Sequence, residues 1–221
     1  MNSVIDIRLP DGAVKQMPAG STPFDVARDI SEGLARAVVS ASYNGAIIET
    51  KTPLTENGDL ILYTFNDVKG KQAFWHSSAH LLAQALEQLY PGIKLTIGPA
   101  IDSGFYYDVD AGDHAITEKE LSDIEKRMLE LARGKHEFHM RSATKAEALA
   151  FYQSVGNEYK TELIESLEDG TITFCDHDDF TDLCRGGHIP NTGIVKAVKL
   201  TNIAGAYWRG DENNKQLTRI Y

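Results

Sequence analysis

The chain has 221 residues, of which 42% are hydrophobic and 24% charged, so it can build a buried core without disulfides. Its formal net charge of -10 argues against a broad polyphosphate-binding surface and confines any nucleic-acid contact to local basic patches. No apolar run reaches the roughly 18 residues of a membrane span and no signal-peptide pattern is present, so we expect a cytoplasmic protein with two reduced cysteines and no membrane partner.

The first 18 residues predict a β-hairpin and the next segment a helix. Residues 4–9 and 13–17 form short alternating runs around a Pro-Asp-Gly turn, a pattern typical of paired strands. Ser21 or Thr22 can cap the helix that follows, because Pro23 then falls in its first turn. We expect one helix here.

A second hairpin and a final strand complete this segment. Asn44-Gly45 suits the positive φ angles of a type I′ turn between strands at 37–43 and 46–49. Residues 59–65 predict a buried strand. The order hairpin, helix, hairpin, strand is that of a ubiquitin-like β-grasp, and a module of this kind is typical of binding or spacing rather than catalysis.

The remainder of the chain mixes helices and strands, which predicts an α+β fold in two domains. The polar residues 66–72, with Gly70, read as a linker. Beyond them the pattern predicts helices at 74–89, 117–133, 146–152 and 159–167, and strands at 94–97, 105–109, 171–174, 194–200 and 206–208.

Two histidines carry the first chemical signal. His76 and His80 are four residues apart, so a helix places both imidazoles on one face, opposite a leucine-rich face. We expect them to face a cleft or solvent, where two imidazoles suit metal binding or proton transfer. A solvated helix face without a role remains the alternative for the pair alone.

The second signal is the segment Asp182-Leu-Cys184-Arg-Gly-Gly-His188. Within seven positions around a Gly-Gly kink, it contains four residues of types that bind metals or take part in catalysis. The alternative to a functional site is a cysteine that packs as a small hydrophobic residue beside a simple turn. HxxxH with CxxxH matches a four-ligand zinc set in residue type. The same groups can also activate water beside an ester carbonyl without metal, and the spacing leaves both hypotheses open.

The other histidines and the second cysteine lack such company. We expect His114, His136, His139 and His177 to be solvated, since they lie in charged or turn-like stretches. Cys175 follows an apolar run and is predicted to be a buried structural thiol.

Four segments, HSSAHLLAQAL, IGPAIDSGFYYDVD, TDLCRGGH and NIAGAYWRGDENNKQLTRIY, resemble successive signatures of the threonyl-tRNA synthetase family. The β-grasp order of residues 1–66 resembles the TGS domain of that family. The resemblance implies that residues 67–221 form an editing domain, which hydrolyses serine from mischarged seryl-tRNA(Thr) and releases serine and tRNA(Thr). The fold it implies is the α+β fold of threonyl and alanyl synthetase editing domains.

The resemblance also assigns the site. It groups His76, His80, Cys184 and His188 with Tyr107, Lys160 and Asp182 around a site that the family uses without metal. His76 would position or deprotonate water or bond the terminal ribose, with His80 and His188 sharing that work. Lys160 would stabilise the oxyanion or act on water as a base. Asp182 would hold the substrate ammonium or orient an imidazole, Cys184 would shape the pocket and Tyr107 would bond substrate. The family often has proline where this chain has Gly187, a difference that bears on loop rigidity.

The resemblance implies partners and missing parts as well. The substrate would be the 3′ end of tRNA(Thr) carrying serine, and no cofactor is expected at this site. The family's aminoacylation core, which binds ATP, Mg and zinc and forms the homodimer, and its anticodon-binding domain are expected to lie outside this chain. Two alternatives remain: a zinc-dependent deacylase of alanyl type with His76, His80, Cys184 and His188 as ligands, and a non-catalytic RNA-binding module.

Overall fold

The computed structural model describes residues 3–221, which form two compact units. The first unit ends at Phe74 and also takes in Gly186–Pro190, whereas the second comprises Trp75–Arg185 and Asn191–Tyr221. Each unit combines helices with β-sheet, which confirms the predicted α+β class. Within the described residues, no helix is long and apolar enough to cross a membrane.

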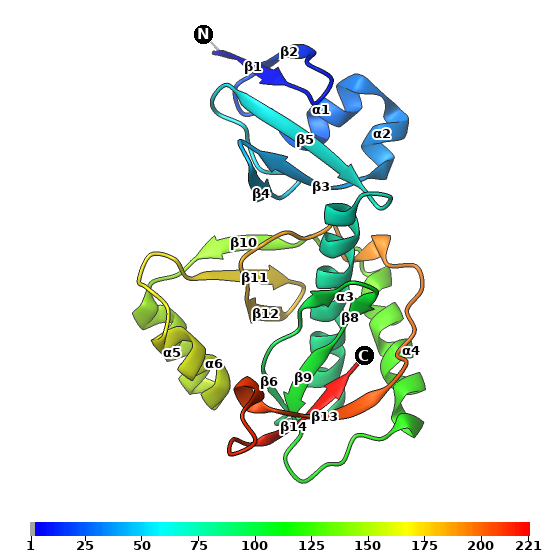
Figure 1. Cartoon of the computed structure of the whole chain (residues 1–221), viewed down its shortest axis with the longest axis vertical. Coiled ribbons are helices and arrows are strands. Elements are labelled where there is room, and N and C mark those ends of the chain that lie inside the picture. Colours follow the sequence, from blue (N-terminus) through cyan, green and yellow to red (C-terminus); the bar gives the residue numbers. More distant parts are fainter. Residues whose placement is uncertain (1–2) are drawn as a thin grey trace. The chain divides into compact units, whose positions relative to one another are not determined.

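The first unit is built on a five-stranded mixed sheet in the order β2-β1-β5-β3-β4 (Figure 1). Its strands β1 and β5 run parallel, and the other pairs are antiparallel. The elements are β1 (Val4–Arg8), β2 (Val14–Pro18), α1 (Pro23–Ile30), α2 (Glu32–Ala37), β3 (Val38–Tyr43), β4 (Ala46–Ile48) and β5 (Gly58–Thr64). This is the predicted β-grasp order, with a core that contains Ile7, Val26 and Leu60.

Local chemistry explains the start of α1 and the turn between β3 and β4. Thr22 caps α1 as predicted, because its hydroxyl accepts from the Asp25 backbone while the Asp25 carboxylate accepts from the Thr22 backbone. Asn44 and Gly45 have φ angles of 49° and 83°, as the hairpin turn requires. The prediction of one helix is wrong, because Ser31 caps α2 directly after α1.

Helix α3 (Val68–Leu89) begins six residues before the predicted start at 74, so the prediction of a linker at 66–72 is wrong for most of that stretch. Gly70 lies inside the helix, where a Cβ atom would come within 1.8 Å of the Thr64 carbonyl oxygen. The glycine therefore serves close backbone packing rather than flexibility. The preceding strand β5 also differs from the prediction of a buried strand, because only Leu60 and Tyr63 among its residues are buried.

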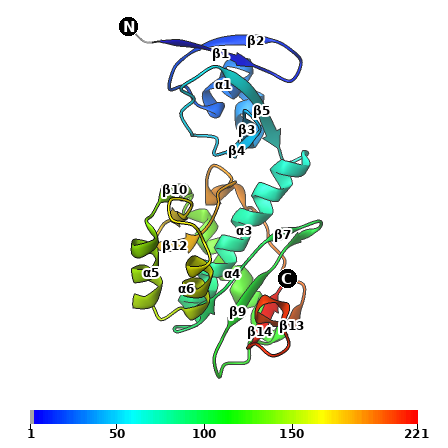
Figure 2. The same cartoon turned by 60° about the vertical axis from the view of Figure 1, so that its left-hand side comes forward.

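The second unit contains a four-stranded sheet in the order β13-β14-β9-β6, a three-stranded sheet β10-β11-β12 and a short β7-β8 hairpin. Figure 2 shows helices α5 and α6 as a packed pair. The strands are β6 (Lys94–Leu95), β7 (Ala100–Ile101), β8 (Gly104–Phe105), β9 (Tyr107–Asp110), β10 (His139–Ser142), β11 (Thr173–His177), β12 (Phe180–Leu183), β13 (Ile203–Tyr207) and β14 (Gln216–Ile220). The helices are η1 (Glu118–Glu120), α4 (Leu121–Arg133), α5 (Lys145–Ser154), α6 (Glu158–Glu165), η2 (Thr192–Ile194) and η3 (Trp208–Gly210).

The predicted helices of this unit are confirmed, but its strands are only partly predicted. Strands β7, β10, β12 and β14 were not predicted from the sequence. The strand predicted at 194–200 is wrong, because η2 occupies its start and the rest has no regular structure. Val195 and Leu200 are nevertheless buried, and the Leu200 backbone N–H donates to the Glu125 carboxylate instead of to a neighbouring strand.

Candidate active site

Helix α3 carries His76 and His80 on one face, with ring centroids 4.7 Å apart. His80 is only 3% exposed, whereas His76 is half-buried. The expectation that both rings face a cleft or solvent is therefore wrong for His80. The predicted leucine-rich face is buried except at Leu89, which is 38% exposed.

Asp182 on β12 is the hub of a buried polar network. Its Oδ1 atom lies 2.5 Å from the Lys160 ammonium nitrogen. Its Oδ2 atom accepts a hydrogen bond from the Tyr107 hydroxyl at 2.8 Å and lies 3.2 Å from His80 Nδ1. Side chains from α3, β9 and α6 thus meet the carboxylate that β12 carries, and each of these four residues is at most 3% exposed.

Two residues that the sequence analysis missed hold this network in place. Asn157 caps α6 through the Lys160 backbone N–H and donates to the Leu95 carbonyl at 2.9 Å, which fixes the helix that carries Lys160. The Tyr152 hydroxyl accepts from the Leu183 backbone N–H at 2.7 Å and lies 3.5 Å from Asp182. An Asn directly before an acidic residue is a sequence pattern typical of a helix N-cap, whereas no pattern in the sequence indicates the role of Tyr152.

The electrostatics of the network favour an ionised Asp182. Burial raises the pKa of Asp182, but the Lys160 ammonium and His80 outweigh burial and hold it well below its usual range. Burial lowers the pKa of His80, yet negative charge at Cys184 and the Asp182 carboxylate raise it on balance. Burial and the neighbouring Asp182 raise the pKa of Tyr107 well above its usual value, so the phenol stays a donor.

Cys184 lies beside the histidine pair. Its Sγ atom is 3.0 Å from His76 Nε2, and its backbone N–H donates to the Thr173 carbonyl, which ties it to β11. His76, His80 and Cys184 each offer a ligand atom, and these atoms lie within 4.8 Å of one another. Two imidazoles and a thiolate are donors that zinc accepts, so the residues fit the zinc alternative in kind.

His188 lies in the segment Gly186–Pro190, which belongs to the first unit. Its Nδ1 atom is 3.0 Å from Glu49 Oε1, and its backbone N–H donates to the same carboxylate. The backbone N–H of Gly187, whose φ is 90°, donates to Glu49 at 3.0 Å. Glu49 was not predicted as a site residue, since a carboxylate at the end of a short strand carries no motif.

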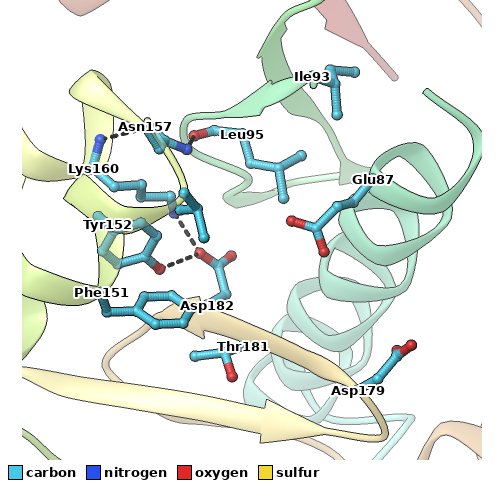
Figure 3. Close-up of a pocket in the computed structure, with 11 residues that line it drawn as sticks. Glu87, Ile93, Leu95, Phe151, Tyr152, Asn157, Lys160, Asp179, Thr181 and Asp182 are labelled. Atoms are coloured by element: carbon cyan, nitrogen blue, oxygen red, sulfur yellow. Dashed lines mark hydrogen bonds and ion pairs between the residues drawn. The ribbon is translucent and has the colours of Figure 1, made fainter. Parts of the chain in front are cut away.

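A cavity of about 360 Å³ reaches the Lys160–Asp182 pair. Figure 3 shows Lys160 and Tyr152 directed at the Asp182 carboxylate, with Glu87 projecting from α3 across the cavity. Phe151 and Leu95 add apolar wall. Burial, together with the charges of Asp182 and Asp179, raises the pKa of Glu87. The cavity thus combines an apolar wall with charged groups, which suits a small polar substrate group.

Of the four remaining histidines, three meet solvent and one is buried. His114 and His136 are exposed enough to meet water, and His139 is exposed, as expected. His177 is only 2% exposed and packs 4.8 Å from the Phe138 ring, so the prediction that it is solvated is wrong. Cys175 is fully buried, as predicted for a structural thiol.

Two family models match the chain. Residues 5–62 match the TGS domain, and residues 172–221 match the "Threonyl and Alanyl tRNA synthetase second additional domain". The second match includes Asp182, Cys184 and His188, whereas His76 and Lys160 lie before it.

Curated relatives match almost the whole chain. The chain is 66% identical to Threonine--tRNA ligase of Flavobacterium johnsoniae, over 99% of this chain and 33% of the relative. It is 53% identical to Threonine--tRNA ligase of Cytophaga hutchinsonii and 52% identical to that of Porphyromonas gingivalis, each over 99% of this chain and 34% of the relative. The chain thus spans about a third of the length of the curated relatives it matches.

Proposed function

Because this chain belongs to the threonyl-tRNA synthetase family, with a TGS domain and the second additional domain, we propose that it hydrolyses the ester of mischarged seryl-tRNA(Thr). The observation that carries the proposal is Asp182, which joins the Lys160 ammonium, the Tyr107 hydroxyl and the His80 imidazole in one buried network. Such convergence of titratable groups is typical of a catalytic centre.

In the proposed reaction, water adds to the ester carbonyl and passes a proton to His76. Lys160 stabilises the oxyanion that forms on the carbonyl oxygen, which a buried cation does more strongly than an exposed one. The carbon–oxygen bond to the ribose then breaks, and the ribose oxygen takes the proton back. Serine and tRNA(Thr) leave as products. Geometry and titration range suit an imidazole for this proton transfer.

The other side chains position these groups. Both Asp182 oxygens are engaged by Lys160, Tyr107 and His80, so Asp182 orients an imidazole rather than holding the substrate ammonium. Cys184 shapes the pocket beside His76. We propose that His188, four residues after Cys184, joins this set, with its ring oriented by Glu49.

Serine selectivity is part of the proposal. Serine lacks only the methyl group of threonine, and one methyl group in a binding pocket discriminates by roughly 1 to 3 kcal/mol. A second, hydrolytic site that admits the seryl ester and misplaces the threonyl ester adds a further round of discrimination. The chain's role would then be correction rather than charging.

Single-turnover hydrolysis of seryl- and threonyl-tRNA(Thr) tests the proposal, with the metal content of the same preparation assayed. We expect selective loss of serine, abolished in His76→Ala and retained in the control His139→Ala, whose imidazole is exposed in the same unit. Bound seryl-tRNA that stays intact at high enzyme concentration would contradict the proposal and favour a non-catalytic RNA-binding module.

The ligand atoms of His76, His80 and Cys184 favour one alternative, a zinc-dependent deacylase of alanyl type. With His188 these residues would hold zinc, which would supply Lewis-acid polarisation of bound water. Asp182 would then contact Nδ1 of His80 and so orient this imidazole as a zinc ligand. Stoichiometric zinc, with hydrolysis lost on chelation and restored by zinc, would select this alternative.

The activity of the longer relatives is proposed for the protein as a whole. We infer that it attaches threonine to tRNA(Thr) with ATP and Mg, through a zinc-containing and dimer-forming core outside residues 1–221. Within these residues, 1–66 would be the TGS domain and 67–221 the editing domain.

A further inference from the structure

A basic hollow of about 190 Å³ lies at the end of α4, within the second unit. We define it by its lining, which consists of Leu129, Ala132, Arg133, Lys135, Gly193, Val195 and Lys196. Arg133, Lys135 and Lys196 are exposed, and the lining contains no carboxylate among residues 3–221. None of these residues belongs to the network around Asp182.

The hollow is a built feature rather than a chance gathering of side chains. The His136 backbone N–H donates to the Thr192 hydroxyl, and the Thr192 backbone N–H donates to the His136 carbonyl. These two bonds join the segment after α4 to η2. Thr192 is fully buried. Lys135 has a φ of 56°, a left-handed conformation that a lysine adopts at a cost and that the two joined segments maintain.

Gly193 leaves room for the Lys135 side chain. A Cβ atom at Gly193 would lie 2.6 Å from the Lys135 Cγ atom, so only glycine lets the lysine stem cross at this point. The stem therefore packs on the Gly193 backbone at the wall of the basic hollow, and Lys135 as a whole is exposed. A pre-positioned cation loses less side-chain entropy when it binds an anion.

In the part of the chain that the structure describes, no ion pair includes Arg133, Lys135 or Lys196. Nearby basic residues are engaged, since Arg127 pairs with Glu130 and Lys199 with Glu125. The carbonyl of Ala132 at the end of α4 accepts from the Thr192 hydroxyl and from the Lys135 backbone. Side-chain cations are thus not needed to cap α4, although lysine and arginine often serve this purpose.

The chemistry of the basic hollow matches a nucleic-acid backbone. Clustered Lys and Arg side chains neutralise phosphodiesters, and Leu129, Ala132 and Val195 offer an apolar floor for the edge of a ribose. In a chain with 32 acidic and 22 basic side chains, such a carboxylate-free site is where a polyanion can approach. We propose that the basic hollow binds the phosphodiester backbone of the substrate tRNA, an inference that rests on the proposed function for its choice of RNA.

The test compares the triple variant R133Q/K135Q/K196Q with the control K119Q/R209Q/K215Q, which removes the same charge from exposed positions of the same unit. The binding of labelled tRNA(Thr) to the 221-residue chain is followed by fluorescence anisotropy over a KCl series. We expect the triple variant to bind about tenfold more weakly at 0.1 M salt, with a salt slope reduced by about one per lost phosphate contact. Equal binding by the triple variant and the control would overturn the inference.

A second substrate separates this inference from the proposed function. Seryl ester on adenosine alone has no phosphodiester, so the triple variant should hydrolyse it at the wild-type rate while losing activity on seryl-tRNA at low concentration. If the triple variant also loses activity on seryl-adenosine, the basic hollow acts on the catalytic network and not on the backbone. If wild type cleaves neither substrate, the proposed function fails, and the anisotropy comparison still decides the inference.

Discussion

Glu49 holds His188 by both its backbone and its ring. One carboxylate oxygen lies 3.0 Å from the imidazole Nδ1, and the other accepts from the His188 backbone nitrogen at 3.1 Å. A carboxylate on Nδ1 fixes the tautomer with the proton there, so that Nε2 carries the lone pair. His188 is fully buried, so this orientation persists without competition from water.

Removing this carboxylate should impair catalysis more than substrate binding. We expect Glu49→Gln to lower kcat for seryl-tRNA hydrolysis about 10- to 100-fold, the range seen when partners that orient a histidine are lost, with KM little changed. Glu49→Asp should recover part of the rate. Glu56→Gln is the control, since Glu56 is exposed in the same unit. A change confined to KM would contradict a positioning role.

Gly187 should not tolerate proline in this chain. Its φ of 90° is inaccessible to proline, whose ring fixes φ near −65°, and its N–H donates to Glu49. We therefore expect Gly187→Pro to displace His188 and abolish hydrolysis, with Gly187→Ala less severe because its Cβ would sit 3.5 Å from Ile47. Circular dichroism should show the fold retained. Full activity in Gly187→Pro would show that the loop does not need this conformation.

The Lys160–Asp182 pair should be strongly coupled. Breaking a buried pair leaves an uncompensated charge, so Lys160→Met and Asp182→Asn should each cost about 3 to 5 kcal/mol of unfolding free energy. The double variant should be destabilised by about 1 to 3 kcal/mol less than the sum. Urea unfolding of all four proteins measures this coupling.

The exposed pair Arg141–Asp176 provides a matched cycle, since its side chains are 48% and 30% exposed. Solvent screening should limit its coupling to about 1 kcal/mol or less. Additive costs at Lys160 and Asp182 would show that the two charges do not depend on each other.

The sequence predicts this molecule best where local chemistry decides the outcome. The helix cap at Thr22 and the Asn44-Gly45 turn depend on residues that are close in sequence, and both are confirmed. The burial of Lys160 cannot be predicted from neighbouring residues, because it depends on Asp182, 22 residues later and in another element. Strand β12 was also missed, and it joins its sheet through pairing with β11.

Packing against neighbouring groups also explains the predictions that failed. The run at 194–200 has the apolar content of a strand, yet the carboxylate of Glu125, 75 residues away, binds its last backbone N–H. Gly70 read as a flexible linker residue but lies in a helix, where the Thr64 carbonyl leaves no room for a side chain. Pattern analysis sees neither constraint, because each is set by a neighbour outside the helix or strand period.

Glu87 should destabilise the fold at neutral pH. Burial and the charges of Asp182 and Asp179 raise its pKa above the reference value of 4.5. The folded state then binds a proton more tightly than the unfolded state. Stability is therefore lost as pH rises from the unfolded pKa through the higher folded pKa, the reverse of an ion-paired carboxylate.

We accordingly expect Glu87→Gln to raise the unfolding free energy at pH 7.5 by a few tenths of a kcal/mol, a small effect because the side chain is partly exposed to screening solvent. The gain should vanish below about pH 4, where the wild-type carboxyl is protonated in both states. Urea unfolding at both pH values measures it, with Glu212→Gln as an exposed control outside the cavity. Destabilisation by Glu87→Gln at pH 7.5 would mean that the carboxylate has a favourable partner, and that the cavity is less acidic than its lining indicates.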